Sequence, residues 1–115
     1  MILVIFEVTI KEERMDGYLA VAAKLKEELA KAKGFIRAER FSSLVTERKL
    51  LSLSVWEDEE AVNEWRNQQE HRQGQRQGRD ALFESYTITV ASALRSYTDQ
   101  DRHEAPADSN ALYEQ

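Results

Sequence analysis

The feature that most constrains the fold is a nearly unbroken apolar run at the start of the chain. Between residues 2 and 10 only Glu7 and Thr9 are polar, and most of the others are β-branched. β-branched residues favour strands, and a strand that is apolar on both faces has both faces covered. Alternation along a strand puts the two polar residues on the same face as Leu3 and Ile5. The sequence therefore predicts a buried strand over residues 2–10.

Periodicity divides the next part of the chain into alternating helices and strands. Apolar residues three and four apart predict helices, and alternating runs rich in β-branched residues predict strands. The predicted elements in chain order are a strand over residues 2–10, a helix from Met15 to Ala32, strands over residues 35–44 and 48–56, a helix from Asp58 to about Gly78, and a strand over residues 83–95. Because residues 45–47 are a short connection, the two middle strands are expected to form an antiparallel hairpin.

The order β-α-β-β-α-β predicts an α+β fold of the ferredoxin-like type, with an antiparallel sheet and both helices on one face. The residues expected to meet the helices are Val4, Phe6, Val8, Ile10, Leu51, Leu53, Val55, Tyr86, Ile88 and Val90. The other face would collect Glu7, Thr9, Ser52, Ser54, Thr87 and Thr89 beside Leu3, Ile5, Leu50 and Trp56. Such a mixed face suits a second sheet packed around a semi-polar cavity. The simplest donor is a second copy, so we expect a homodimer.

The acidic charge of the chain is concentrated at its C-terminal end. The formal net charge is −5, and residues 98–115 hold five acids and one base, against 16 acids and 15 bases in residues 1–97. We expect one domain over residues 1–97 and an acidic, flexible tail over residues 98–115. The domain is near neutral, and no aromatic residues interleave with the arginines of residues 66–79. We therefore expect no nucleic-acid partner.

The cellular setting is inferred from what the chain lacks. It has no cysteine, which excludes disulfides, thiolate zinc sites and cysteine nucleophiles. The longest apolar run, Met1 to Phe6, is too short to cross a membrane. It begins at the first residue and is followed by charged residues, unlike a signal peptide. We therefore expect a cytoplasmic protein without a membrane partner.

A series of short motifs follows the strand and helix order. They are Gly34-Phe35-Ile36, Leu50-Leu51-Ser52-Leu53-Ser54-Val55-Trp56, Glu59-Glu60-Ala61-Val62, Trp65-Arg66, Glu70-His71-Arg72, Gly78-Arg79 and Leu82-Phe83. With these motifs, residues 1–97 resemble the antibiotic biosynthesis monooxygenase (ABM) domain family of the dimeric α/β barrel superfamily. The resemblance implies a homodimeric, cofactor-independent monooxygenase. It would oxidise a small aromatic substrate, phenolic, quinol-like or polyketide-like, with O₂ in a cavity between sheet and helices.

Two other functions remain open on the same fold. One is a non-catalytic dimer that binds a small ligand or a partner protein, because the helix and sheet patterns would be equally good. The other is an isomerase or stress-response protein that transfers a proton without using oxygen. The resemblance favours the oxygenase, and the other two functions differ from it in whether O₂ is consumed.

Trp65 and His71 are the candidate catalytic residues. Trp65 falls where the family pattern has a helix tryptophan that faces the cavity, and an indole offers an apolar wall and one N–H donor. His71 belongs to the Glu-His-Arg motif, and imidazole is a natural base for a phenol. Deprotonation would make the substrate electron-rich enough to reduce O₂. The alternatives are a core tryptophan and a surface or dimer-contact histidine.

Candidate substrate contacts besides Trp65 are Trp56, Glu7, Arg40 and Arg72. Glu7 lies within a strand, where a buried carboxylate needs a partner such as Arg37 or Arg40. It would either line the cavity as a hydrogen-bond acceptor or form a cross-strand ion pair. Arg72 belongs to a basic stretch that would either bind an anionic ligand or balance the acidic surface.

No metal or other cofactor is expected. The two histidines are far apart in the sequence, and the acidic run over residues 57–60 is typical of a helix N-terminus. Heme-degrading members of the superfamily have an asparagine in the first strand and a histidine ligand about three turns after the helix tryptophan. Here that position is Gln75, and the first strand has no asparagine. Glutamine is a poor heme ligand, so the departure argues against heme degradation.

Overall fold

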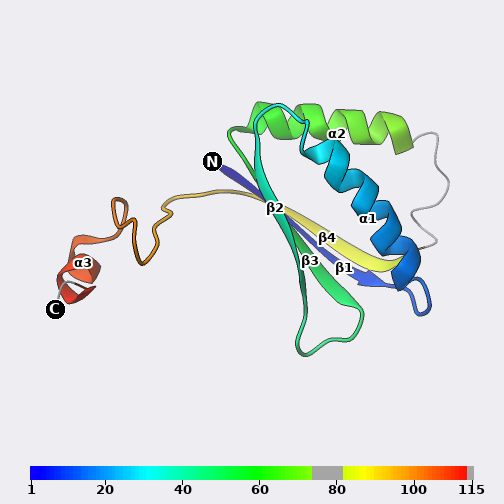
Figure 1. The fold of residues 1–115 in the computed structure, drawn as a ribbon, viewed down its shortest axis with the longest axis horizontal. Helices are drawn as coiled ribbons and strands as arrows, with labels where there is room; N and C mark the ends of the chain where they lie inside the picture. Colours follow the sequence, from blue (N-terminus) through cyan, green and yellow to red (C-terminus); the bar gives the residue numbers. More distant parts are fainter. Residues whose placement is uncertain (74–81, 114–115) are drawn as a thin grey trace.

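The fold is a four-stranded antiparallel sheet with two helices on one side (Figure 1). The computed structural model describes residues 1–73 and 82–113, apart from the side chains of residues 70–73 and 113. Its elements are β1 (Ile2–Ile10), α1 (Met15–Leu29), β2 (Phe35–Ser42), β3 (Lys49–Trp56), α2 (Glu59–Gln73), β4 (Phe83–Ser92) and α3 (Ala107–Tyr113). The ferredoxin-like order predicted from the sequence is confirmed.

Strand β1 lies inside the sheet, whose order is β2-β3-β1-β4 with all neighbours antiparallel. Its bounds are those predicted from the apolar run. Its neighbours on both edges and the packing of its helix-facing residues account for part of this composition. Leu3 and Ile5 lie on the opposite side of the sheet and are only partly buried. Two other strands were predicted to be longer than they are. The strand predicted over residues 35–44 ends at Ser42, and the strand predicted over residues 83–95 ends at Ser92.

Gly34 fixes the point where α1 gives way to β2. Its φ is +81°, which glycine adopts without strain. A Cβ at this position would lie 2.5 Å from the Cβ of Ala61 in α2. The Glu57 N–H donates to the Gly34 carbonyl at 2.8 Å, which ties the start of β2 to the end of β3. The missing side chain therefore allows α2 to pack closely over this turn.

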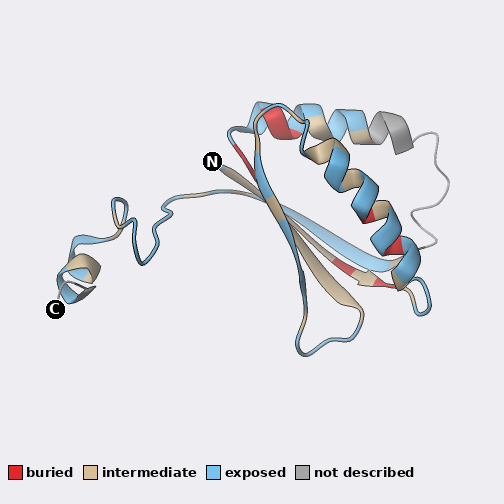
Figure 2. Cartoon of the chain, viewed as in Figure 1, coloured by how far each residue is buried: buried red, intermediate tan, exposed pale blue. Residues whose placement is uncertain are grey.

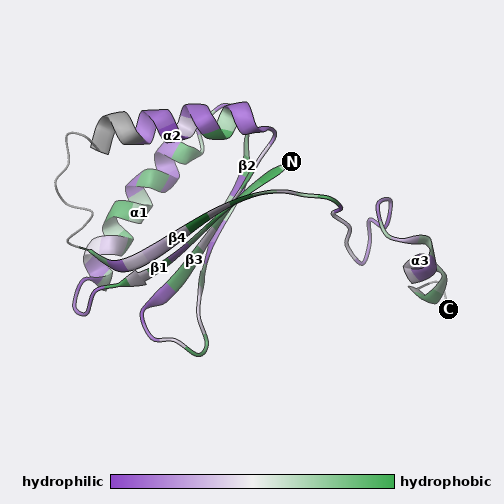
Figure 3. Ribbon diagram, turned by 180° about the vertical axis from the view of Figure 1, so that it is seen from behind, coloured by the Kyte–Doolittle hydropathy of each residue, from purple (hydrophilic) through white to green (hydrophobic). Residues whose placement is uncertain are grey.

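Helix α2 begins as the sequence predicted. The Asp58 carboxylate accepts a hydrogen bond from the Ala61 N–H at 2.8 Å, and Glu59 and Glu60 occupy the first turn. The cap satisfies a free N–H group, and the negative charges interact favourably with the positive end of the helix dipole. Figure 3 shows that α2 is hydrophilic along most of its length, with an apolar patch near its start. The predicted end of this helix near Gly78 lies outside the described residues.

The register of β3 differs from the prediction. Ser52 pairs with Phe6 and Trp56 pairs with Ile2, and directly paired residues share a face. Leu50, Ser52, Ser54 and Trp56 therefore face the helices, whereas Leu51, Leu53 and Val55 lie on the opposite side. The predicted assignment of β3 was wrong because alternation defines two faces without saying which one is covered. The face was set by Trp56, which is buried against α2.

The core has two separate clusters on the helix-facing side (Figure 2), and Val55 is buried on the opposite side of the sheet. The first joins Val8 and Ile10 of β1 to Tyr18 and Ala22 of α1. The second joins Trp56 to the start of α2. Ser52, Ser54, Ala38 and Arg40 belong to neither cluster, although they lie on the same side of the sheet. In the middle of this side, polar or small side chains of β2 and β3 therefore lie beside the apolar residues of β1 and β4.

The C-terminal segment leads away from the sheet and ends in α3 (Figure 1). Its centre is Arg102, whose guanidinium donates to Asn110 at 3.0 Å and Ser109 at 2.8 Å and lies 5.1 Å from the Tyr97 ring. The sequence predicted no regular element beyond residue 97. A seven-residue helix held by side-chain hydrogen bonds leaves no apolar periodicity to detect.

Candidate functional site

Strand register arranges the helix-facing side of the sheet in rows of side chains. Directly paired residues of the four strands project to the same side and lie within contact distance of one another. In the order β2, β3, β1, β4, the two central rows are Ala38–Ser54–Val4–Val90 and Arg40–Ser52–Phe6–Ile88. These rows lie between the two core clusters and form the floor of the candidate site.

One end of the floor is closed by three aromatic rings. Trp56 is 1% exposed, and its ring lies 6.1 Å from that of Trp65 and 5.5 Å from that of Phe35, centroid to centroid. The indole N–H of Trp56 donates to the Ser54 hydroxyl at 2.9 Å. Trp65 is only half-buried. The two tryptophans chosen from the sequence are thus brought together, with Trp56 in the core and Trp65 at its border.

The other end carries a second aromatic group, which the sequence analysis did not single out as a site. The Phe6 ring lies 5.8 Å from that of Phe83 and 5.7 Å from that of Tyr86. The Tyr18 ring of α1 lies 5.8 Å from that of Phe83. These residues come from three different elements, so only the register of β1 and β4 could have joined them. The one signal in the sequence was the alternation that placed Phe6 and Tyr86 on the helix-facing side.

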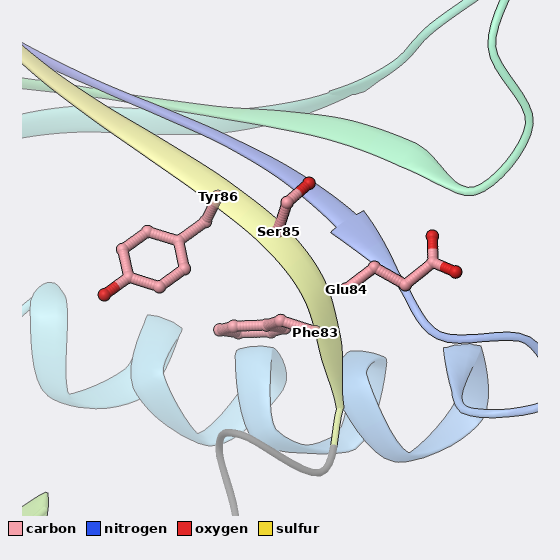
Figure 4. Close-up of a pocket in the computed structure, with 4 residues that line it drawn as sticks. All are labelled: Phe83, Glu84, Ser85 and Tyr86. Atoms are coloured by element: carbon pink, nitrogen blue, oxygen red, sulfur yellow. The ribbon is translucent and has the colours of Figure 1, made fainter.

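A hollow of about 300 Å³ lies beside this second group and is lined by Phe83, Glu84, Ser85 and Tyr86. The rings of Phe83 and Tyr86 lie between β4 and α1, and Glu84 and Ser85 point elsewhere (Figure 4). Along the same side of β4, Tyr86, Ile88 and Val90 are each more than half exposed. The described helices therefore leave this aromatic and apolar strip accessible to a ligand.

Arg40 lies beside this aromatic group. Its guanidinium carbon lies 5.9 Å from the centre of the Tyr18 ring, within the range of a cation–π contact. Within the described part of the chain, no carboxylate lies within 4 Å of it. Arg40 is exposed, so its charge remains available to an anionic group.

Glu7 lies on the opposite side of the sheet, away from Trp56, Trp65 and Arg40. Its carboxylate is 3.8 Å from the ammonium group of Lys49, and both side chains are about 40% exposed. The prediction that Arg37 or Arg40 would pair with the Glu7 carboxylate was therefore wrong. Glu7 also borders a second hollow of about 290 Å³, whose other lining residues are Phe41, Ser42, Ser43, Lys49, Leu50 and Leu51. The site residues predicted from the sequence therefore lie on both sides of the sheet.

His71 and Arg72 belong to α2, and their side chains lie outside the described residues, as does Gln75. Among the residues described, no three histidine, aspartate or glutamate side chains gather as a metal site. Nor is any helix in the described ranges long and apolar enough to span a bilayer.

These features define a ferredoxin-like α+β domain whose helix-facing side carries two aromatic groups with the serines of β3 between them. The family model described as "Antibiotic biosynthesis monooxygenase" matches residues 1–77, which is about two thirds of the chain. The chain belongs to this family.

Two relatives in sequence and one solved structure illustrate the relationship. "Jasmonate monooxygenase ABM" of Pyricularia oryzae is 38% identical over 96 residues, which are 84% of this chain and 45% of that protein. This chain therefore spans less than half of that relative's length. The "Uncharacterized protein YqjZ" of Bacillus subtilis is 31% identical over 87 residues, 76% of this chain and 75% of that protein. The structure of SnoaB, described as a cofactor-independent oxygenase from Streptomyces nogalater, superposes with a TM-score of 0.67. Its sequence identity is 17%, with 83% of this chain and 94% of that chain covered, so this likeness shows the fold.

Proposed function

We propose that this chain is a monooxygenase that oxidises a small phenolic or quinol-like aromatic with O₂ and without a cofactor. The observation that carries the proposal is the pairing of Trp56 and Trp65 beside the hydroxyls of Ser52 and Ser54 on the helix-facing side. Flat apolar walls with a few fixed polar groups suit an aromatic ring that bears oxygen substituents. Membership in the family supports oxygenation, and the lining supports this substrate class.

The proposed substrate class also explains how the reaction balances without a cofactor. A phenol with a free C–H position and one O₂ give a quinone and one water. One oxygen atom becomes the new carbonyl, and the other leaves as water with the two hydrogens removed. All four electrons taken up by O₂ come from the aromatic ring. The protein then needs only to bind the ring, remove the phenolic proton and exclude competing reactions.

Three residues have proposed roles in this reaction. Trp65 is the wall that holds the aromatic ring, because it is half-buried at the border of the site. His71 accepts the phenolic proton, a role assigned from its motif and from the pKa of imidazole near 6.5. Arg40 carries a positive charge beside Tyr18 and attracts the resulting phenolate or another anionic substituent.

The acting unit is proposed to be a homodimer formed through the side of the sheet opposite the helices. We call this the bare side, because none of the described helices covers it. Its residues include Leu3, Ile5, Leu51, Leu53 and Phe41 together with Glu7, Lys49, Thr87 and Thr89. An apolar sheet face of this kind is normally covered. A second copy of the same sheet would cover it in a two-fold symmetric contact.

The test is oxygen uptake by the purified protein with a panel of naphthols and hydroquinones. Jasmonate is added to the panel because the Pyricularia relative is named for it. We expect uptake with at least one phenol, and a quinone product that carries one atom from ¹⁸O₂. Trp65→Phe should weaken substrate binding, and His71→Ala should lower the rate about 10²–10⁴-fold, the usual contribution of a general base. His103→Ala in the C-terminal segment is the matched control and should change neither.

The outcome against the proposal is equally definite. No uptake across the panel, while a known cofactor-independent oxygenase responds under the same conditions, would overturn it. Saturable binding without turnover would then favour the non-catalytic ligand-binding dimer. A product formed without O₂ would favour the isomerase.

A further inference from the structure

Gln69 of α2 carries a buried hydrogen-bond donor that the fold does not use. Its side-chain amide nitrogen is shielded from solvent, and within the described part of the chain no acceptor is in reach of it. It is the one buried side-chain nitrogen or oxygen in this condition among the described residues. Leaving such a donor unsatisfied destabilises the folded state, so each instance in a native protein calls for an explanation.

The position of Gln69 on α2 directs it toward the candidate site. Residues three and four apart lie on the same face of a helix, and Val62, Trp65 and Gln69 have this spacing. Val62 and Trp65 pack on the sheet with Trp56. Gln69 therefore belongs to the face of α2 that meets the sheet, one turn beyond Trp65. Its neighbour Gln68 is exposed and lies on a different face.

We infer that the Gln69 amide donates a hydrogen bond to an oxygen of the substrate bound against Trp65. This inference rests on the proposed function and narrows its substrate class to rings that carry a carbonyl or phenolate oxygen. A fixed N–H donor in a site shielded from water stabilises the negative charge that develops on such an oxygen. Among the described residues the donor has no partner. Because its nitrogen is shielded from solvent, the Gln69 side chain must change its rotamer before the nitrogen can reach a ligand oxygen, and the desolvation penalty is relieved only when that contact forms.

This role has a signature that a purely structural glutamine would not show. Methionine has nearly the volume of glutamine and no strong donor, so Gln69→Met removes the unsatisfied group and keeps the packing. We expect Gln69→Met to unfold at the same urea concentration as the parent protein or at a higher one. The same substitution should weaken the binding of ligands that carry an acceptor oxygen. A substitution that keeps or raises stability but weakens ligand binding is typical of a residue that serves function and not folding.

The experiment uses 1-tetralone and tetralin, two bicyclic ligands that differ in one carbonyl group. Equilibrium dialysis gives the ratio of their dissociation constants for the full chain, for Gln69→Met and for the matched control Gln68→Met. We expect Gln69→Met to reduce the preference for tetralone about 5- to 10-fold, the usual worth of one hydrogen bond. Tetralin binding should stay within about twofold of its parent value, because the volume is conserved. Gln68→Met should leave both constants and the urea midpoint unchanged.

Several results would overturn the inference. They are an unchanged preference in Gln69→Met, no measurable binding of tetralone to the parent protein, or a clear loss of stability with the preference intact. If Gln69→Met and Gln69→Leu both fail to fold, the amide holds the structure and the inference also falls. Failure of the proposed function is distinguishable. A preference that depends on Gln69 without oxygen uptake keeps the inference and removes the oxygenase, and uptake with an unchanged preference does the reverse.

Discussion

The two sides of the sheet place their polar and apolar residues in an unexpected way. On β3, the serines and Trp56 face the helices, and the alternating leucines face the bare side. A domain that only needed a core would put Leu51 and Leu53 under the helices and Ser52 and Ser54 toward solvent. The reverse arrangement gives the helix-facing side hydroxyl groups in its middle. It gives the bare side a set of apolar residues, of which Val55 is buried within the chain and Leu3, Ile5, Leu51 and Leu53 remain partly exposed.

The difference teaches that the helix-facing side combines two tasks. Its two ends are closed by the core clusters around Ile10 and Trp56, which hold the helices to the sheet. Its middle has the partly polar lining that a small oxygenated ring needs. In the proposed homodimer, the bare side has one task, contact with the sheet of the second copy. Substitutions on the two sides should therefore differ in what they change, and four predictions test this difference.

The largest effect is expected from Ile10→Ala, on the helix-facing side. Ile10 is completely buried, so the change removes three carbons from a packed cluster that cannot fully collapse. We expect the free energy of unfolding to fall by about 2–5 kcal/mol in urea denaturation. Ile36→Ala removes the same atoms from a residue that is half exposed, and should cost about 1 kcal/mol or less. Equal losses from the two variants would contradict the assignment of the closed core to this side.

Leu53→Asp tests the bare side by changing association. In the proposed dimer it would bury a carboxylate on each of two facing sheets, without a partner for either charge. We expect the dissociation constant of the dimer to rise about 100-fold or more, because unpaired interfacial charges cost several kcal/mol. Sedimentation velocity over a range of protein concentrations measures it. Leu44→Asp is the control, since Leu44 lies fully exposed in the β2–β3 hairpin loop. A parent protein that is monomeric at micromolar concentration would remove the dimer altogether.

The order of elements could be predicted from the sequence because apolar residues recur with a different spacing in helices and in strands. β1 was predicted to the residue, since its apolar run ends at the charged residue Lys11. The face of β3 could not be predicted, because Leu and Ser alternate there and the alternation is compatible with either orientation. Only the packing of Trp56 on α2 decides it. The Glu7–Lys49 pair was missed for a similar reason, since it depends on which residues of β1 and β3 lie diagonally opposite.

The candidate site was predictable only in part. Trp56 and Trp65 were selected from the sequence, and the structure brings them together. The aromatic group around Phe83 was missed because its members come from separate elements. Gln69 had a signal that was overlooked among the glutamines of α2, namely its spacing from Val62 and Trp65. Helix periodicity gives the face of a residue, but whether its amide finds a partner depends on tertiary packing.

A third prediction concerns the hydrogen bond inside the helix-facing side. Ser54→Ala removes the acceptor of the buried Trp56 indole N–H, which leaves an unsatisfied donor and costs about 1–3 kcal/mol. The thermal midpoint should fall, and the tryptophan emission should shift as the Trp56 environment changes. Thr46→Ala, at an exposed position in the β2–β3 hairpin loop, is the control and should change stability by about 0.5 kcal/mol or less. Equal effects at both positions would mean that the Ser54 hydroxyl contributes no more than a surface group.

The smallest effect is expected from the Glu7–Lys49 pair on the bare side. The charges are 3.8 Å apart and partly exposed in the single chain, so their coupling should be about 0.2–1 kcal/mol. A double-mutant cycle with Glu7→Gln and Lys49→Gln measures it by urea denaturation. If a second copy covers the bare side, water is excluded from the pair and the coupling should be larger in the parent protein than in the Leu53→Asp background. Equal couplings in the two backgrounds would show that the second sheet does not reach Glu7. The dimer contact would then be confined to the rows nearer Leu3 and Leu53.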